Sequence, residues 1–323
     1  MRSAKTLHNV ERSVMELRRS YASMRRQFAK FKLPCQTSVN AEHPTTEPWL
    51  TIETLLHYTD RADIAILKGT IGETKQIVVK FGAQLPLEEE YAITERLYDA
   101  RIPNFVKYLC YFSCKDTFAD LFHQNYRSRP YICNGRDANP INNIGCTVMP
   151  YYPIGSMKDY AWTEAELPAL KNLAKQCCFS MLDAYVSLGF IHRDIHLGNV
   201  LLRKTKKHAI QYKHAELRVE GGMYAIWMDL ERHMIVQDAD PANAESGLKE
   251  LYNALLITIN MMCRSSNSDI VLEFNQRRLL DRKSAGRPIT PAFYAELGED
   301  LDAIKLEYVR SKLPKIDFRM PMR

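Results

Sequence analysis

The segment Ile191–Leu202 contains the side chains with the clearest capacity for chemistry. Asp194 and Asn199 lie five positions apart within it. A carboxylate and a carboxamide at this spacing suit a phosphoryl-transfer loop, in which Asp194 accepts the proton of an attacking hydroxyl and Asn199 holds a metal ion beside the phosphate. The apolar residues Val200–Leu202 predict a short buried strand that fixes the end of this loop.

A lysine and a glutamate upstream form a second candidate pair. Ile77–Phe81 is rich in β-branched residues, which predicts a strand that carries Lys80. The next segment has helical periodicity, and one face of that helix holds Glu90, Ile93 and Leu97. Because this face points to the core, Glu90 is the expected partner of Lys80. Two other glutamates stay open as alternatives, Glu88 and Glu89.

An aspartate downstream follows an apolar run, Tyr224–Met228, which predicts a further strand. The five polar residues occur along the chain in the order Lys80, Glu90, Asp194, Asn199 and Asp229. This order resembles that of the protein-kinase-like superfamily. The resemblance implies an α+β fold with two lobes: a small antiparallel sheet with one key helix, and a mainly helical second lobe. It also implies ATP and Mg²⁺ as cofactors.

The resemblance gives each of these residues a role in phosphoryl transfer. Lys80, braced by Glu90, would position the α/β-phosphates of ATP. Asp194 would orient the acceptor hydroxyl and take its proton. Asn199 and Asp229 would hold Mg²⁺.

The catalytic segment resembles one group within the superfamily more closely. His192–Thr205 is very similar to the loop of haspin, an atypical Ser/Thr protein kinase. The distance from Asn199 to Asp229 leaves room for an extended hairpin, at roughly Ala209–Met228, as in haspin. Kinase-like proteins of large DNA viruses share some of these traits. The resemblance covers about residues 64–256.

Two residues beside Asp194 are further catalytic candidates. Arg193 stands where small-molecule kinases commonly have a small residue, so it favours a protein substrate. His196 either contacts the γ-phosphate or the substrate, or has a structural role in the loop.

The segment Val148–Met157 looks like a kinase hinge that leaves a strand. Met149 would line the back of the adenine pocket. Main-chain groups of Pro150 and Tyr152 would meet the adenine edge, because a hinge that uses backbone atoms tolerates proline where only a carbonyl is needed. Two further positions are candidates for nucleotide contact, Ile66 and Val78. The alternative is a Pro/Gly-rich linker.

Three features depart from the kinase pattern. No glycine occurs between Trp49 and Gly69, so the position of the glycine-rich loop, about Thr59–Ile66, lacks the residues that let backbone N–H groups approach phosphates. Leu230–Glu231 follows Asp229 in place of Phe-Gly. The activation segment is short, so we do not expect control by its phosphorylation.

The sequence divides into three parts. Residues 1–48 are predicted to be a basic amphipathic arm and linker, 49–150 one lobe with an insertion at about 115–144, and 151–323 the second lobe. The first 35 residues include nine basic and two acidic ones. This arm could bind nucleic acid, an anionic membrane surface or an acidic protein, or it packs on the lobe with a solvated basic face. The insertion either packs on its lobe or contacts a partner.

Composition is that of an ordinary globular protein, with 46% hydrophobic and 25% charged residues among 323. No run of 18 apolar residues occurs and the N-terminus is charged, so we expect neither a membrane span nor a secretory signal. Eight irregularly spaced cysteines predict reduced thiols and no zinc site. The expected location is intracellular: cytoplasm or nucleus, or the virion if the protein is viral.

These patterns favour transfer of the ATP γ-phosphoryl group to a Ser or Thr hydroxyl of a protein substrate. Two other classes of function stay open. A small-molecule phosphotransferase of the aminoglycoside or choline type resembles the same His-x-Asp-x-His-x-x-Asn pattern. A pseudokinase that acts as a scaffold is consistent with the missing glycines.

Overall fold

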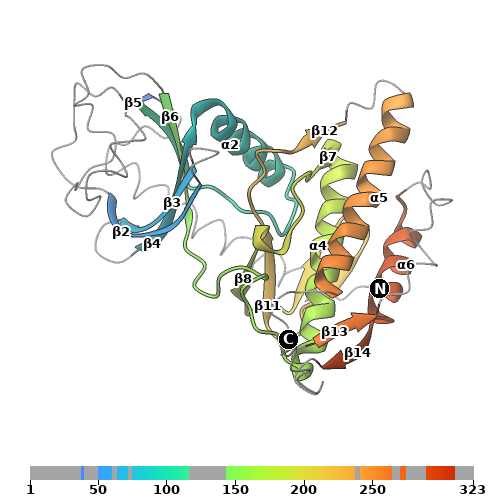
Figure 1. Ribbon diagram of the computed structural model, residues 1–323. Coiled ribbons are helices and arrows are strands. Elements are labelled where there is room, and N and C mark those ends of the chain that lie inside the picture. Colours follow the sequence, from blue (N-terminus) through green and yellow to red (C-terminus); the bar gives the residue numbers. More distant parts are fainter. Residues whose placement is uncertain are drawn as a thin grey trace, which may run out of the picture. The chain divides into compact units, whose positions relative to one another are not determined.

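The computed structural model describes residues 38–39, 50–59, 64–71, 75–115, 143–236, 241–263, 270–273 and 289–309. The predicted arm and linker, apart from Ser38 and Val39, and residues 116–142 of the predicted insertion lie outside this set. The chain forms two compact units (Figure 1). The small unit comprises Met1–Tyr98 and Val106–Tyr151, and the large unit comprises Asp99–Phe105 and Tyr152–Arg323. Helices and antiparallel strand pairs occur in both, which confirms the predicted α+β class.

The small unit contains a six-stranded sheet with the strand order β1-β5-β6-β4-β3-β2. Its strands are β1 (Ser38–Val39), β2 (Leu50–Thr59), β3 (Ile64–Ile71), β4 (Lys75–Ala83), β5 (Cys110–Lys115) and β6 (Asn143–Pro150). β1 pairs with β5 in parallel, and the other neighbours are antiparallel. The predicted strand Ile77–Phe81 is confirmed within β4, where all of its residues are buried. Continuous burial indicates that both faces of β4 are covered.

Helix α2 (Gln84–Asp99) follows β4 and lies beside the sheet (Figure 1). The predicted buried face of this helix is confirmed at Glu90, Ile93 and Leu97. Gly145 of β6 lies beneath the first turn, since a Cβ atom there would be 3.0 Å from the Gln84 Cα and 3.1 Å from the Leu87 Cβ. Because glycine has no side chain, Gly145 lets the helix approach the sheet closely.

We expect Gly145→Ala to lower the free energy of unfolding by about 1–3 kcal/mol, because the Gln84 backbone leaves no room for a methyl group. Gly298→Ala in α6 (Pro291–Asp302) is the control, since its added Cβ would meet only the Phe179 Cζ, at 3.5 Å. The control should be neutral or stabilising by up to about 1 kcal/mol, because alanine favours a helix over glycine. Urea denaturation of both variants measures the difference, and an unchanged Gly145→Ala protein would contradict this packing.

Strand β5 begins only at Cys110, so residues 106–109 precede the regular strand. Asn104 has a φ of 67° and turns the chain just before this segment. Residues 106–109 are all buried, without the alternation of a strand that has one solvent face. The Leu109 N–H nevertheless donates to a β6 carbonyl at 2.6 Å. This segment therefore lies beside the sheet before it joins the regular strand pairing.

The large unit is mainly helical. α4 (Leu167–Leu188) and α5 (Pro241–Cys263) lie side by side, and α6 contacts α4 (Figure 1). The buried faces of α4 and α5 include Leu170, Leu173, Cys177, Met181, Leu251, Leu255, Ile259 and Met262. Tyr185 of α4 is only half-buried. In the described part of the chain, no helix has both the length and the apolar character needed to cross a membrane.

The large unit contains short strands, of which β7 and β8 lie at the two ends of the predicted catalytic segment. They are β7 (Phe190–Ile191), β8 (Val200–Lys204), β9 (Ala209–Gln211), β10 (Glu216–Arg218), β11 (Met223–Trp227), β12 (Met234–Ile235), β13 (Ile270–Glu273) and β14 (Lys305–Val309). The extended hairpin expected at roughly Ala209–Met228 is confined to β9 and β10, because β11 returns to pair with β8. Gly221 and Gly222, both at positive φ, make the turn between β10 and β11.

Candidate functional site

The buried ion pair of the small unit joins Lys80 on β4 to Glu90 on α2. Lys80 Nζ lies 3.0 Å from Glu90 Oε2, and the Tyr108 hydroxyl donates a hydrogen bond of 2.5 Å to Glu90 Oε1. The two side chains of the pair are 5% and 0% exposed. Glu90 is the partner expected from the helical spacing, whereas the alternatives Glu88 and Glu89 are exposed. A carboxylate buried to this degree depends on such donors to remain charged.

Three residues predicted to contact the nucleotide lie on the same face of the sheet as Lys80. Residues directly opposite each other on paired strands share a face. Lys80 lies opposite Ile66 of β3, and Val78 lies opposite Met149 of β6. Because Val78 and Lys80 are two positions apart on β4, all four residues lie on one face. Val78 and Met149 are buried, and Ile66 is half-buried.

Thr147 is a neighbour of Lys80 that was not among the predicted site residues. It lies opposite Lys80 on β6, its side chain is fully buried, and its hydroxyl has no hydrogen-bond partner among the described residues. A buried hydroxyl without a partner is destabilising, so this position suits a hydrogen bond to a bound group. The two-residue alternation of β6, counted back from Met149, could have identified it.

Some backbone groups that follow β6 already form hydrogen bonds within the protein. The Tyr151 N–H donates to the Gln76 carbonyl at 3.3 Å, and the Gly155 N–H donates to the Tyr152 carbonyl at 3.0 Å. The Tyr152 carbonyl therefore closes a turn and already uses one of its two lone pairs. Pro150 has only its carbonyl to offer.

Asn199 holds together the predicted catalytic loop of the large unit, at the end of the short helix η3 (Leu197–Asn199). Its side-chain nitrogen donates to the Asp194 carbonyl at 2.9 Å and lies 3.4 Å from Asp194 Oδ2. Its main-chain carbonyl accepts the Met228 N–H at 2.9 Å. One buried residue therefore fixes both Asp194 and the residue that precedes Asp229.

The oxygen atoms of this loop suit a magnesium ion. Because Asn199 Nδ2 is used within the loop, its Oδ1 is the atom that can face a cation, an orientation assigned from the hydrogen bonds. Asp229 offers carboxylate oxygens, and Mg²⁺ takes oxygen ligands. The chemistry of both predicted ligands is therefore compatible with this ion.

His192 connects the backbone on the two sides of the loop. Its side chain is buried, its Nε2 lies 3.0 Å from the Met228 carbonyl, and its Nδ1 accepts the Asp194 N–H at 3.3 Å. A carbonyl can only accept and a backbone N–H can only donate, so Nε2 carries the proton and Nδ1 does not. The imidazole is therefore neutral, and burial lowers its pKa to about 4.

The lowered pKa of His192 predicts a loss of stability in mild acid. In the unfolded chain the imidazole titrates near pH 6.5, so between pH 6.5 and 4 the unfolded state binds a proton that the folded state excludes. The free energy of unfolding should fall by about 2 kcal/mol from pH 7 to pH 5 through this group. In His192→Gln, which keeps a donor for the Met228 carbonyl, urea denaturation should show a shallower pH dependence. The same pH dependence in both proteins would contradict this assignment.

Asp229 has a backbone conformation that is rare for a residue with a side chain. Its φ of 61° lies in the left-handed region, which costs a non-glycine residue about 1–2 kcal/mol. The residues before it are held firmly: Met228 is bonded through its N–H and its carbonyl, and the Trp227 N–H donates to the Asn104 carbonyl at 2.7 Å. Backbone strain that surrounding bonds maintain is typical of functional positions.

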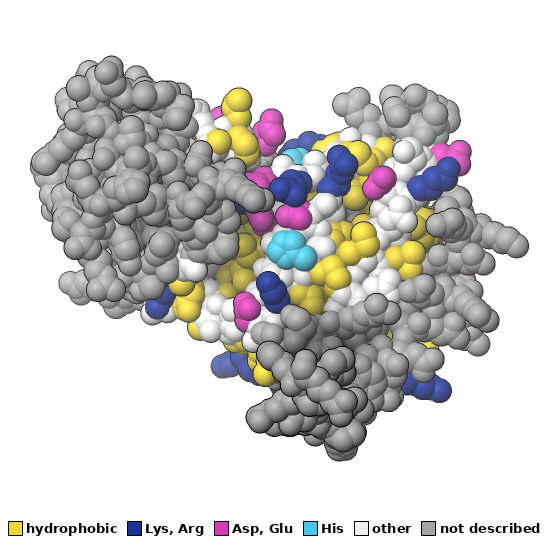
Figure 2. Space-filling model, viewed as in Figure 1, with side chains coloured by type: hydrophobic (Ala, Val, Ile, Leu, Met, Phe, Trp, Pro, Cys, Tyr) yellow, Lys and Arg dark blue, Asp and Glu magenta, His cyan; other side chains and the backbone are white. Residues whose placement is uncertain are grey.

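Two basic side chains flank the Asp194 carboxylate, one near each oxygen. His196 Nε2 lies 3.8 Å from Oδ2, and Arg232 Nη1 lies 4.0 Å from Oδ1. The sequence analysis missed Arg232, although a cation three residues after Asp229 in a short segment could have indicated it. Arg193 is exposed and has no ion pair among the described residues. Figure 2 shows charged side chains of both signs close to histidine on the visible face of the protein.

A buried hydrogen-bond network supports β11. Asn104 Nδ2 donates to the Ala225 carbonyl at 2.8 Å and to Gln176 Oε1 at 3.1 Å, and the Tyr212 hydroxyl donates to Asn104 Oδ1 at 2.7 Å. Gln176 Oε1 also accepts the Ala225 N–H at 2.9 Å. The three side chains are almost fully buried. The network therefore fixes the strand that ends just before Asp229.

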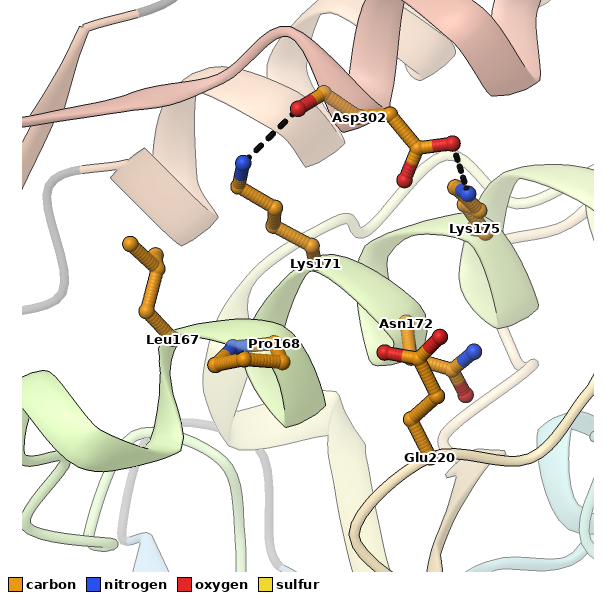
Figure 3. Close-up of a pocket in the computed structure, with 7 residues that line it drawn as sticks. All are labelled: Leu167, Pro168, Lys171, Asn172, Lys175, Glu220 and Asp302. Atoms are coloured by element: carbon orange, nitrogen blue, oxygen red, sulfur yellow. Dashed lines mark hydrogen bonds and ion pairs between the residues drawn. The ribbon is translucent and has the colours of Figure 1, made fainter.

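A separate polar pocket of about 220 Å³ lies in the large unit, where the start of α4 meets the end of α6 (Figure 3). Figure 3 shows two lysine side chains directed toward Asp302. Lys171 Nζ donates to the Asp302 carbonyl at 2.7 Å, and Lys175 Nζ lies 2.5 Å from Asp302 Oδ2. The cations of this pocket are therefore already paired, and none of the predicted site residues lines it.

No protein-family model matches the chain, and no curated protein matches its sequence at a significant level. The function is therefore inferred from the residues and contacts described above.

Proposed function

We propose that the protein is an ATP-dependent serine/threonine protein kinase of the atypical, haspin-like kind. The observation that carries this proposal is the hydrogen bonding of Asn199, which ties Asp194 to the residue before Asp229. A candidate base and two candidate metal ligands are thereby held on one loop framework. The buried pair of Lys80 and Glu90 supports the proposal, because a lysine braced by a glutamate matches the phosphate-positioning group of the kinase-like pattern.

The reaction requires a base that faces the acceptor hydroxyl. Asp194 would accept the proton of a Ser or Thr hydroxyl as its oxygen bonds to the γ-phosphorus of ATP and ADP leaves. The Asp194 side chain is 26% exposed, so a substrate can reach it. His192 and Asn199 hold the Asp194 backbone, which keeps the carboxylate in one position. When bound, Mg²⁺ at Asn199 and Asp229 would offset the negative charge of the phosphates.

The nucleotide would be positioned by residues of the small unit. Lys80 would contact the α/β-phosphates, and its own position is set by Glu90, which Tyr108 fixes through a second hydrogen bond. The apolar contacts of the adenine ring would come from Ile66, Val78 and Met149. Since Glu90 is fully buried and has a donor on each carboxylate oxygen, we expect the pair to remain formed without an activating modification.

A protein acceptor is favoured over a small molecule. Arg193 is exposed next to Asp194 in the chain, and Arg232, also exposed, lies 4.0 Å from its carboxylate. Aminoglycosides and choline are cations, which two exposed arginines would repel. A peptide segment that carries acidic or neutral residues around its Ser or Thr would not be repelled. Arg193 and Arg232 therefore favour a polypeptide substrate.

A thermal-shift measurement with ATP, with and without Mg²⁺, tests the proposal against a pseudokinase scaffold. MgATP should raise the midpoint of unfolding more than ATP alone, because a ligand that binds only the folded state stabilises it. The variant Asp229→Asn should lose the Mg²⁺-dependent part of this shift. A wild-type midpoint that does not respond to Mg²⁺ would favour the scaffold, which the lack of glycine at residues 59–66 also suits.

A further inference from the structure

The ring of Tyr224 on β11 is contacted by two basic side chains. Arg203 Cζ lies 4.9 Å from the ring centroid, and Lys207 Nζ lies 5.3 Å from it. Arg203 is directly opposite Tyr224 on the paired strand β8, and Lys207 follows in the connection to β9. Both side chains are half-buried. One aromatic surface therefore holds two positive charges within about 10 Å of each other.

The described residues provide no ion-pair partner for either of these cations. In the described part of the chain, no carboxylate forms an ion pair with Arg203 or Lys207, whereas Lys175 and Lys249 of the same unit each have one. Burial, together with the charge of Arg203, lowers the pKa of Lys207 to about 8. The pair thus consists of two like charges, partly removed from water, without the counter-charge that usually accompanies such groups.

Hydrogen bonds fix the backbone at Lys207 and the Tyr224 ring. The Thr205 N–H donates to the Gly222 carbonyl at 2.8 Å, and the Lys207 N–H donates to Thr205 Oγ1 at 3.1 Å. The Tyr224 hydroxyl accepts the Asn104 N–H at 3.0 Å, which joins the ring to the buried network beneath β11. Because the ring and this backbone segment are already ordered, less conformational freedom is lost when a ligand binds beside them.

We propose that Arg203 and Lys207 form a binding site for a phosphate group. A guanidinium fork beside an ammonium group matches an anion of two charges, and a phosphate monoester carries about 1.5 to 2 negative charges at pH 7. A carboxylate carries one charge and would leave the pair with a net positive charge. Lys204 and Lys206 are exposed beside the pair and add to the positive potential. The site uses none of the residues assigned to phosphoryl transfer, so it stands independently of the proposed function.

The geometry fits a single phosphate group better than a nucleic-acid strand. Proteins that bind single strands offer exposed aromatic rings on which bases stack. Tyr224 is only 6% exposed, and the two cations lie against its ring. The phosphate would therefore be free inorganic phosphate or the phosphorylated side chain of another protein.

Lysine acylation followed by mass spectrometry tests the site directly, because it reports Lys207 separately from every other lysine. The full chain is labelled with a limiting N-hydroxysuccinimide ester in phosphate-free buffer, with and without added inorganic phosphate. At a phosphate concentration about ten times the Kd, labelling of Lys207 should fall about tenfold, because only the unoccupied site reacts. Lys249, which has Glu245 as its partner, is the internal control and should not change. Unchanged labelling of Lys207 at phosphate on the order of 10 mM would overturn the proposal.

Charge-removing variants give a second readout. Arg203→Gln and Lys207→Gln keep part of each side-chain stem over the Tyr224 ring, and thermal unfolding without phosphate shows whether they remain folded. Each should weaken phosphate binding at least about tenfold in calorimetric titrations, because a charge-assisted hydrogen bond is lost. Lys249→Gln removes the same charge elsewhere and should bind as the wild type does. Wild-type affinity in both site variants would refute the assignment.

Two further ligands identify the source of the phosphate. A phosphoserine peptide that binds more tightly than inorganic phosphate would indicate a phosphorylated protein, and equal affinity would indicate free phosphate. Either result supports the site if Lys207→Gln weakens the binding of these ligands. Oligonucleotides of increasing length give the opposing outcome. If they displace phosphate and bind more tightly as their length grows, the site is a strand-binding surface and the proposed single-phosphate site is wrong.

Discussion

Replacing Asp194 with asparagine is expected to abolish phosphoryl transfer. The amide cannot accept the proton of the acceptor hydroxyl, and a general base contributes about 10²- to 10⁴-fold to the rate of such reactions. Binding of MgATP should persist, because Asn199 keeps its hydrogen bond to the main-chain carbonyl of residue 194 and Lys80 is unchanged. Measuring kcat and the nucleotide Kd separately distinguishes the two effects.

Asp302→Asn is the matched control for this variant. It makes the same chemical change at an exposed carboxylate of the large unit, whose partner is Lys175. Loss of this surface ion pair should cost about 0–1 kcal/mol in the free energy of unfolding and leave kcat unchanged. If Asp194→Asn retained the wild-type kcat, proton transfer to Asp194 would not be part of the mechanism.

Replacing Glu90 with glutamine should strongly destabilise the protein. Lys80 is 5% exposed, and the change would remove the carboxylate that lies 3.0 Å from its buried ammonium group. Breaking one side of a buried ion pair costs about 3–5 kcal/mol. Tyr108→Phe, which removes only the second hydrogen bond to Glu90, should cost about 1.5–3 kcal/mol. Urea denaturation gives both values.

Two further variants separate charge burial from other causes. Glu88→Gln makes the same substitution at an exposed position of α2 and should change the free energy of unfolding by less than about 0.5 kcal/mol. Adding Lys80→Met to Glu90→Gln also removes the buried ammonium group, so it should restore much of the stability but none of the nucleotide binding. A Glu90→Gln protein as stable as Glu88→Gln would contradict the ion pair.

Sequence periodicity alone predicted those elements in which the burial of apolar side chains follows one regular pattern. The helical spacing that joins Glu90 to Ile93 and Leu97 identified the buried face of α2, because burial of apolar side chains selects that face. The β-branched run around Lys80 identified β4 for the same reason. The roles of Asp194, Asn199 and Asp229 in the reaction remain predictions from motif and spacing.

Contacts between distant segments could not be predicted in this way. Asn104 bonds to Gln176 and Ala225, which lie 72 and 121 positions along the chain, and its left-handed backbone has no local signal apart from the residue type. Tyr212 reaches the same network from the β9–β10 hairpin, whose separation from β8 and β11 was also not foreseen. Such positions depend on tertiary packing, which periodicity does not contain.

The most direct test of the central claim is transfer of label from γ-labelled ATP in the presence of Mg²⁺. Histones, casein and the protein itself serve as acceptors, and acid hydrolysis identifies the labelled amino acid. We predict phosphoserine or phosphothreonine with the wild-type protein, none with Asp194→Asn, and wild-type levels with Asp302→Asn. Equal incorporation by the wild type and Asp194→Asn, or no transfer to any acceptor by a wild-type protein that binds MgATP, would contradict the proposed kinase activity.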